Sequence, residues 1–278
     1  MNRLPPGRIL WGGTLAPFPV AEQLVAAEHL GYHAMSISLD TVAAAEESGM
    51  PAAELARRAA GHGVRLAVLE PVVTWLPVDP RWAMARHDLD RVERYGEALG
   101  VSAVCVLAGS GLGLSIDEIA DRYAALCRRF AAHGWRTCIE FAPMSGIRDL
   151  PEARRLTTRA DPGTAGVIFD TWHFCRGAAD LADLAASGAG LIDYVQVSDA
   201  ARAVSGSLGR DTYHRLLPGE GSFDLAGVLG VLRGLGALGA VGPEVITPAF
   251  AELTCVEAAR RATEATERHL AAAEVVAW

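Results

Sequence analysis

Four oxygen-bearing side chains stand at or near the ends of separate apolar runs in the sequence: Glu140, Asp170, Gln196 and Glu244. Glu140 and Gln196 lie within their apolar runs, where an unpaired polar side chain costs about 1–3 kcal/mol or more, so both need a partner. Two glutamates, an aspartate and an amide oxygen brought together would repel one another without a cation between them. Such ligands suit one divalent ion, Mg²⁺ or Mn²⁺ first, with Co²⁺ or Zn²⁺ as alternatives.

Acidic residues at the end of a strand also have a simpler interpretation, because they often cap the helix that follows. Asp40 and Glu70 each follow an apolar run, and capping is the first interpretation for both. Glu70 is in addition a candidate for contact with a substrate. The set of four is different, because capping does not explain polar residues inside apolar runs.

The elements that must position these residues alternate along the chain. Short runs rich in Val, Ile and Leu predict eight strands, at 8–13, 34–39, 64–70, 102–108, 136–141, 165–170, 191–197 and 240–246. Apolar residues recurring every three or four positions predict helices at 19–31, 46–62, 86–99, 115–133, 148–159, 179–187, 223–237 and about 250–274.

Eight strand–helix units match the α/β class and a single (β/α)8 TIM barrel. No linker rich in Pro, Gly or Ser divides the units, so residues 1–278 are predicted to form one domain. An open doubly wound sheet is the competing architecture. In a closed barrel the carboxyl ends of strands five to eight meet at one mouth, with neighbouring strands about 4.8 Å apart.

The composition excludes several function classes. All 25 basic residues of the 278-residue chain are Arg, so chemistry that needs a lysine amine, such as Schiff-base, pyridoxal-phosphate or P-loop catalysis, is excluded. The net charge of −8 provides no basic stripe for nucleic acid.

Cysteine use and the apolar stretches indicate the compartment. The five cysteines form no CxxC pair, so neither a disulfide framework nor a thiolate zinc site is expected. No apolar stretch approaches the roughly 18 residues of a membrane span, and the N-terminus has no signal-peptide pattern. We therefore expect a cytoplasmic protein with no membrane partner.

An ordered set of motifs resembles one known superfamily over nearly the whole chain. The strings are CIEF (138–141), FDTWH (169–173), VQVSDAAR (195–202), LLPGEGSFD (216–224) and PEV (243–245). Together they are similar to the sugar phosphate isomerase/epimerase superfamily, the xylose isomerase-like TIM barrels. The resemblance implies that Glu140, Asp170, Gln196 and Glu244 hold a single divalent metal.

One position departs from the usual motif of that superfamily. The motif at strand seven reads His-x-x-Asp, whereas this chain has Gln196 and Asp199. Glutamine occurs there in some relatives, including bacterial 3-dehydroshikimate dehydratases and hydroxypyruvate isomerases. The substitution argues against a ketohexose 3-epimerase.

The shared chemistry of these relatives is removal of a proton from carbon next to a carbonyl, with the metal stabilising the resulting oxygen anion. The resemblance implies that Glu140 and Glu244 act as acid and base, and that His173 donates or accepts a proton. It also implies that Arg202 clamps substrate oxygens. The aromatic residues Trp75 and Trp172 suggest a partly apolar mouth, although core packing explains them equally well.

Three outcomes can follow the common enolate: epimerisation, isomerisation or loss of water. We predict a divalent-metal-dependent isomerase or epimerase acting on a small polyhydroxy ketone. The alternatives are a lyase of the 3-dehydroshikimate dehydratase type and a catalytically silent barrel that binds a small molecule. Relatives are often dimers or tetramers, so a homo-oligomer is also an expectation.

Overall fold

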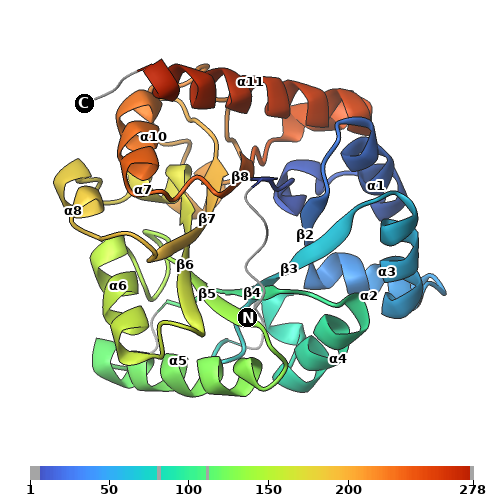
Figure 1. The fold of residues 1–278 in the computed structure, drawn as a ribbon, viewed down its shortest axis with the longest axis horizontal. Helices are drawn as coiled ribbons and strands as arrows, with labels where there is room; N and C mark the ends of the chain where they lie inside the picture. The colour runs from blue at the N-terminus through green and yellow to red at the C-terminus, as the bar shows by residue number, and fades with distance from the viewer. Residues whose placement is uncertain (1–6, 80–82, 111–112, 276–278) are drawn as a thin grey trace.

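A parallel barrel dominates the computed structural model, which describes residues 7–79, 83–110 and 113–275 (Figure 1). Within these ranges eight parallel strands pair in the order β1-β8-β7-β6-β5-β4-β3-β2. They are β1 (Gly7–Arg8), β2 (Ala34–Ser38), β3 (Arg65–Val72), β4 (Ala103–Val106), β5 (Arg136–Glu140), β6 (Ala165–Asp170), β7 (Ile192–Val197) and β8 (Ala240–Pro243).

The segment after β1 closes the barrel against β2. Leu10 forms a parallel bridge with Met35, and its amide donates to the carbonyl of Ala34 at 3.1 Å. The carbonyl of Leu10 accepts from the amide of Ser36 at 3.0 Å. The predicted TIM barrel is therefore confirmed, and the open doubly wound sheet is wrong.

Helices surround the strands in a ring (Figure 1). The α-helices are α1 (Val20–His29), α2 (Leu39–Glu47), α3 (Ala52–Gly61), α4 (Leu89–Leu99), α5 (Ile116–Ala131), α6 (Leu150–Arg159), α7 (Thr171–Arg176), α8 (Leu181–Ala185), α9 (Leu208–Asp211), α10 (Leu225–Gly234) and α11 (Cys255–Val275). Short 3-10 helices cover η1 (Gly12–Leu15), η2 (Ala83–Arg86) and η3 (Pro248–Glu252).

Three sequence predictions are corrected here. The helix expected at 46–62 begins only at Ala52, as α3, because Gly49 has a φ of 88° and Pro51 follows it, and a separate helix that was not expected, α2, precedes this turn. The first strand, expected to reach residue 13, gives way to η1 at Gly12. The helices α7 and α9 lie in βα loops where none was expected.

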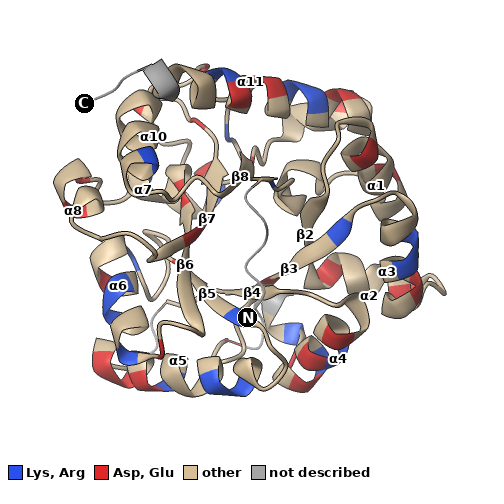
Figure 2. Ribbon diagram, in the orientation of Figure 1, with Lys and Arg blue, Asp and Glu red and all other residues tan. Residues whose placement is uncertain are grey.

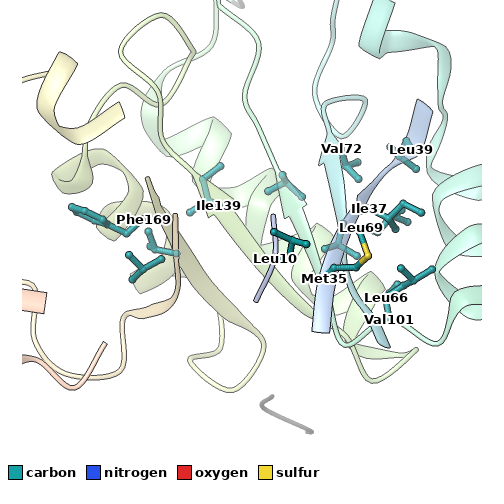
Figure 3. Close-up of a cluster of buried hydrophobic side chains, with 14 of the residues drawn as sticks. Leu10, Met35, Ile37, Leu39, Leu66, Leu69, Val72, Val101, Ile139 and Phe169 are labelled. Atoms are coloured by element: carbon teal, nitrogen blue, oxygen red, sulfur yellow. The ribbon is translucent and has the colours of Figure 1, made fainter. Parts of the chain in front are cut away.

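Alternation along the strands separates two buried layers. The smaller hydrophobic cluster contains Cys138, Ile168 and Tyr194, and we assign it to the barrel interior. Their strand neighbours Ile139 and Phe169 belong to the larger cluster, which packs between strands and helices (Figure 3). Successive side chains of a strand point to opposite faces, so the residue two positions after an interior residue also points inward.

Charged residues lie mainly on the outer helices, where both signs are mixed on α4, α5 and α11 (Figure 2). Many form exposed pairs, such as Arg129 of α5 with Glu93 of α4 at 2.6 Å. In the described part of the chain, no helix combines the length and apolar character needed to cross a membrane.

A buried ion pair holds the strand ends opposite the mouth. The side chains of Arg136 and Asp193 are each 6% exposed and approach to 2.6 Å. Replacing Asp193 by Ala leaves the buried guanidinium of Arg136 without its carboxylate partner and should lower the free energy of unfolding by about 3–5 kcal/mol. Urea titration measures this, with Asp121→Ala as control, because the pair of Asp121 with Arg159 is exposed and should contribute under about 1 kcal/mol. Equal losses in the two variants would contradict the prediction.

Candidate active site

The four predicted ligand residues come together at the carboxyl ends of β5 to β8. Glu140 and Asp170 end their strands, Gln196 is the fifth residue of β7, and Glu244 follows β8 directly. Glu140, Asp170 and Gln196 each come two positions after an interior residue, so they point into the mouth of the barrel. Asp170 and Gln196 are paired in the strand register. All four side chains are buried.

A group able to hold a metal ion forms from Glu140, Asp170 and His173, whose ligand atoms all lie within 4.8 Å of one another. The Nε2 atom of His173 is 3.5 Å from Oε1 of Glu140 and 3.8 Å from Oδ2 of Asp170. Glu244 is not part of this tight group. His173 reaches it from α7, whose N-cap is Asp170 itself.

The surrounding residues fit a divalent ion. The Oε1 atom of Gln196 is buried and has no hydrogen-bond partner within the described ranges, which a cation would supply. Four buried carboxyl groups, including Glu70 and Glu244, face one buried guanidinium, that of Arg215. Such an excess of negative charge in a low-dielectric site favours binding of a cation.

Glu70 belongs to this site, and the helix-cap interpretation of it is wrong. It lies within β3, and its carboxylate accepts a hydrogen bond from the hydroxyl of Ser36. The Ser36 hydroxyl in turn accepts from the amide of Gly12 at 2.8 Å. Asp40 lies in the first turn of α2, whose N-cap is Ser38.

The pKa values of two carboxyl groups are raised. The pKa of Glu70 is raised to about 8, mainly by burial and also by the charges of Glu140 and Asp170, against the lowering effect of the hydrogen bond from Ser36. Burial, followed by the charge of Glu70, raises the pKa of Glu244 well above the ordinary carboxyl value. Both groups therefore retain a proton more readily than a surface glutamate.

This shift predicts a pH dependence of stability. The unfolded Glu70 is ionised above about pH 4.5, whereas the folded residue keeps its proton up to about pH 8. Folding therefore takes up a proton, and the stability of the metal-free protein falls as pH rises from about 5 to 8. Melting temperatures measured in EDTA across this range should show a shallower decline for Glu70→Gln. An identical decline in both proteins would contradict the assigned pKa.

A cavity of about 660 Å³ opens over these groups. Glu70, Glu140, His173 and Glu244 all line it, together with Arg215. Gly13 lines it too, and an added Cβ there would collide with the carboxylate of Glu244. A side chain at position 13 would therefore force the Glu244 carboxylate to move.

Three predicted substrate contacts lie elsewhere. Arg202 is exposed and is not among the residues that line the cavity. Trp75 is buried, donates its indole N–H to the carbonyl of Leu107 at 2.8 Å and packs on Tyr123. Trp172 is fully buried, with the guanidinium of Arg215 5.4 Å from its ring centroid. Both tryptophans therefore contact residues that line the cavity, Leu107 and Arg215, without lining it themselves.

Arg215 is a buried member of this site to which the sequence analysis assigned no role. Arg215 is 2% exposed and pairs with Oδ2 of Asp170 at 2.7 Å. Its Nη1 also donates to the backbone carbonyl of Glu244 at 3.1 Å, so it ties the ends of β6 and β8 together. Its position directly before the LLPGEGSFD motif was the available signal.

Asp199 stabilises the loop that follows Arg215. Its carboxylate accepts from the amides of Gly219, Gly221 and Phe223 at 3.0–3.1 Å. Its backbone pairs with Leu216, the residue after Arg215. The aspartate of the Gln-x-x-Asp segment therefore shapes the site from a distance.

Comparisons with known proteins place this barrel in a family. A family model described as xylose isomerase-like TIM barrel matches residues 24–272. The chain is 31% identical to 3-dehydroshikimate dehydratase of Pseudomonas aeruginosa over 171 residues, which are 59% of this chain and 27% of that protein. It is 27% identical to inosose isomerase of Bacillus licheniformis over 136 residues, 48% of each protein. The chain thus spans about half or less of the curated relatives it matches.

A solved structure shows the same fold. The crystal structure of the IolI protein with a bound zinc atom has a TM-score of 0.81 at 19% identity, covering 95% of this chain and 98% of that chain. The family match extends over most of the chain and agrees with the observed barrel. The chain therefore belongs to the xylose isomerase-like TIM barrel family.

Proposed function

We propose that the protein is a divalent-metal-dependent isomerase or epimerase that removes a proton next to the carbonyl of an uncharged polyhydroxy ketone. The observation that carries this proposal is the convergence of buried oxygen donors from Glu140, Asp170 and Gln196 beside His173, at the floor of a 660 Å³ cavity. The relatives named inosose isomerase support the reaction class.

Glu140, Asp170, Gln196 and Glu244 would hold the ion. When bound, it supplies positive charge that polarises the ketone and stabilises the oxygen anion left by proton removal. The oxygen donors suit Mg²⁺ or Mn²⁺, and the nearby imidazole of His173 is compatible with Co²⁺ or Zn²⁺.

The chain's own residues handle the proton. Glu244 lines the cavity, where its carboxylate can exchange a proton with a substrate carbon, as an acid/base catalyst requires. Glu140 is its proposed partner, and His173 donates a proton to, or accepts one from, a substrate oxygen. Return of the proton to the opposite face gives the epimer, and return to the neighbouring carbon gives the isomer.

Charge in the cavity favours an uncharged substrate. Of the described residues that line it, only Arg215 and His173 are basic. Arg215 is paired with Asp170, so it is engaged before any substrate arrives. Among the described lining residues there is thus no unpaired arginine for a phosphate or carboxylate.

A lyase of the 3-dehydroshikimate dehydratase type is the second candidate, favoured by the 31% identity to the Pseudomonas aeruginosa enzyme. It uses the same proton removal, followed by loss of a β-hydroxyl as water. Its substrate carries a carboxylate, for which the described lining of the cavity offers no unpaired arginine.

Deuterium exchange tests the proposal. The manganese-loaded protein, incubated in D₂O with an inosose, should place deuterium on the carbon next to the ketone, and Glu244→Gln should slow this exchange by about 10²-fold or more. With 3-dehydroshikimate, formation of an ultraviolet-absorbing aromatic product would transfer the assignment to the dehydratase. A protein that takes up no metal and exchanges no proton would be the silent barrel.

A further inference from the structure

Apolar side chains from the loops line much of the cavity above its polar floor, and we call this loop-borne part the outer cavity. It is lined by Val78, Leu107, Met144, Tyr213 and Ile246, together with the polar residues Asp79, Ser110, Ser145 and Thr212. The first five follow β3, β4, β5, β7 and β8 respectively, so apolar side chains surround the mouth from five different loops. The residues that the sequence suggested for an apolar mouth, Trp75 and Trp172, are not among them.

The cavity is larger than a monosaccharide needs. A six-carbon polyol fills roughly 200 Å³, the space of about six or seven waters at about 30 Å³ each. The cavity measures about 660 Å³. A polyol held at Glu140 and Glu244 would therefore leave most of the outer space unfilled.

The apolar lining determines what can fill that space. Hydroxyl groups placed against Leu107 or Met144 would lose hydrogen bonds to water without regaining them from these side chains, which is unfavourable. An apolar group in the same place is stabilised by the removal of its surface from water. Tyr213 lines the cavity and is 57% exposed, so an apolar group packed against its ring would also cover exposed aromatic surface.

We infer that the substrate is a polyhydroxy ketone carrying an apolar substituent of about one ring, which the outer cavity binds. This inference rests on the proposed function, because that function fixes the polar end at the floor. The hydroxy-ketone end faces Glu140, His173 and Glu244. The apolar end packs on Met144, Leu107 and Tyr213.

A matched pair of hydroxy-ketones tests the inference. Hydroxyacetone and 2-hydroxyacetophenone differ in carrying a methyl or a phenyl group on the same carbonyl carbon. Calorimetry on the manganese-loaded protein should give a Kd at least about tenfold lower for the phenyl probe. The variants Met144→Ser and Tyr213→Ser should each reduce that advantage several-fold and leave the Kd of hydroxyacetone within about twofold.

Val25→Ser is the matched control, because Val25 is 47% exposed on α1 and does not line the cavity. It should leave both Kd values unchanged. Equal affinities for the two probes, no measurable binding of the phenyl probe, or a phenyl advantage that survives both cavity variants would overturn the inference. Deuterium exchange on the same probes is read separately: exchange with equal affinities rejects only the apolar subsite, and selective binding without exchange rejects only the proposed reaction.

Discussion

Replacing Glu140 by Gln is expected to abolish metal retention and to lower turnover by about 10³-fold, with the fold intact. The amide keeps the size of the carboxylate but removes the negative charge that the ion requires. Glu140 lies among other buried carboxyl groups, and the guanidinium of Arg215 pairs with Asp170 rather than with Glu140. Removing its charge therefore relieves repulsion, so the metal-free variant should melt no lower than the wild type.

Asp170→Asn is the informative comparison. It should lose metal and activity to a similar extent, but it also breaks the buried pair between Asp170 and Arg215. Its free energy of unfolding should therefore fall by about 3–5 kcal/mol, unlike that of Glu140→Gln. Elemental analysis, kinetics and urea titration on the two variants measure these effects. Normal turnover by either variant would show that its residue is not a ligand.

His173→Ala is expected to lower turnover by about 10²-fold or more while the protein keeps its metal. The imidazole lies beside Glu140 and Asp170 and lines the cavity, so it can reach a substrate oxygen.

Gln196→Ala should instead weaken metal binding, with metal affinity falling about 10- to 100-fold. Metal titration and steady-state kinetics on both variants separate the two roles.

His133→Ala is the matched control for the histidine. Its ring is 24% exposed and pairs with Glu93 and Glu97 on the outer surface, far from the strand ends that form the site. Turnover should stay within about twofold of the wild type. If His173→Ala also turns over normally, or if it loses its metal as Glu140→Gln does, the assignment of His173 as a proton-transfer group is wrong.

The fold was predictable because its signals are local. Alternating apolar runs and helical periodicity specify each strand–helix unit, and the repeat of eight units specifies the barrel. The same alternation predicts that Glu140 and Asp170 point inward. The break between α2 and α3 was also visible as Gly49 and Pro51, but the periodicity across it concealed the turn.

The missed parts of the site depend on contacts between residues far apart in the chain. Arg215 pairs with Asp170 from a loop that Asp199 holds through the amides of Gly219 and Gly221. The LLPGEGSFD motif marks that loop in the sequence, but it does not reveal which residue Arg215 pairs with. The role of Glu70 likewise depends on Ser36 from the neighbouring strand, whereas its sequence context alone suggested a helix cap.

Anomalous diffraction from crystals grown with Mn²⁺ tests the central claim most directly. The account predicts a single strong peak at the mouth of the barrel, within coordination distance, about 2.0–2.3 Å, of carboxylate oxygens of Glu140 and Asp170 and of the Gln196 amide oxygen. A barrel without a peak there, or with manganese bound at another place on the molecule, would contradict it.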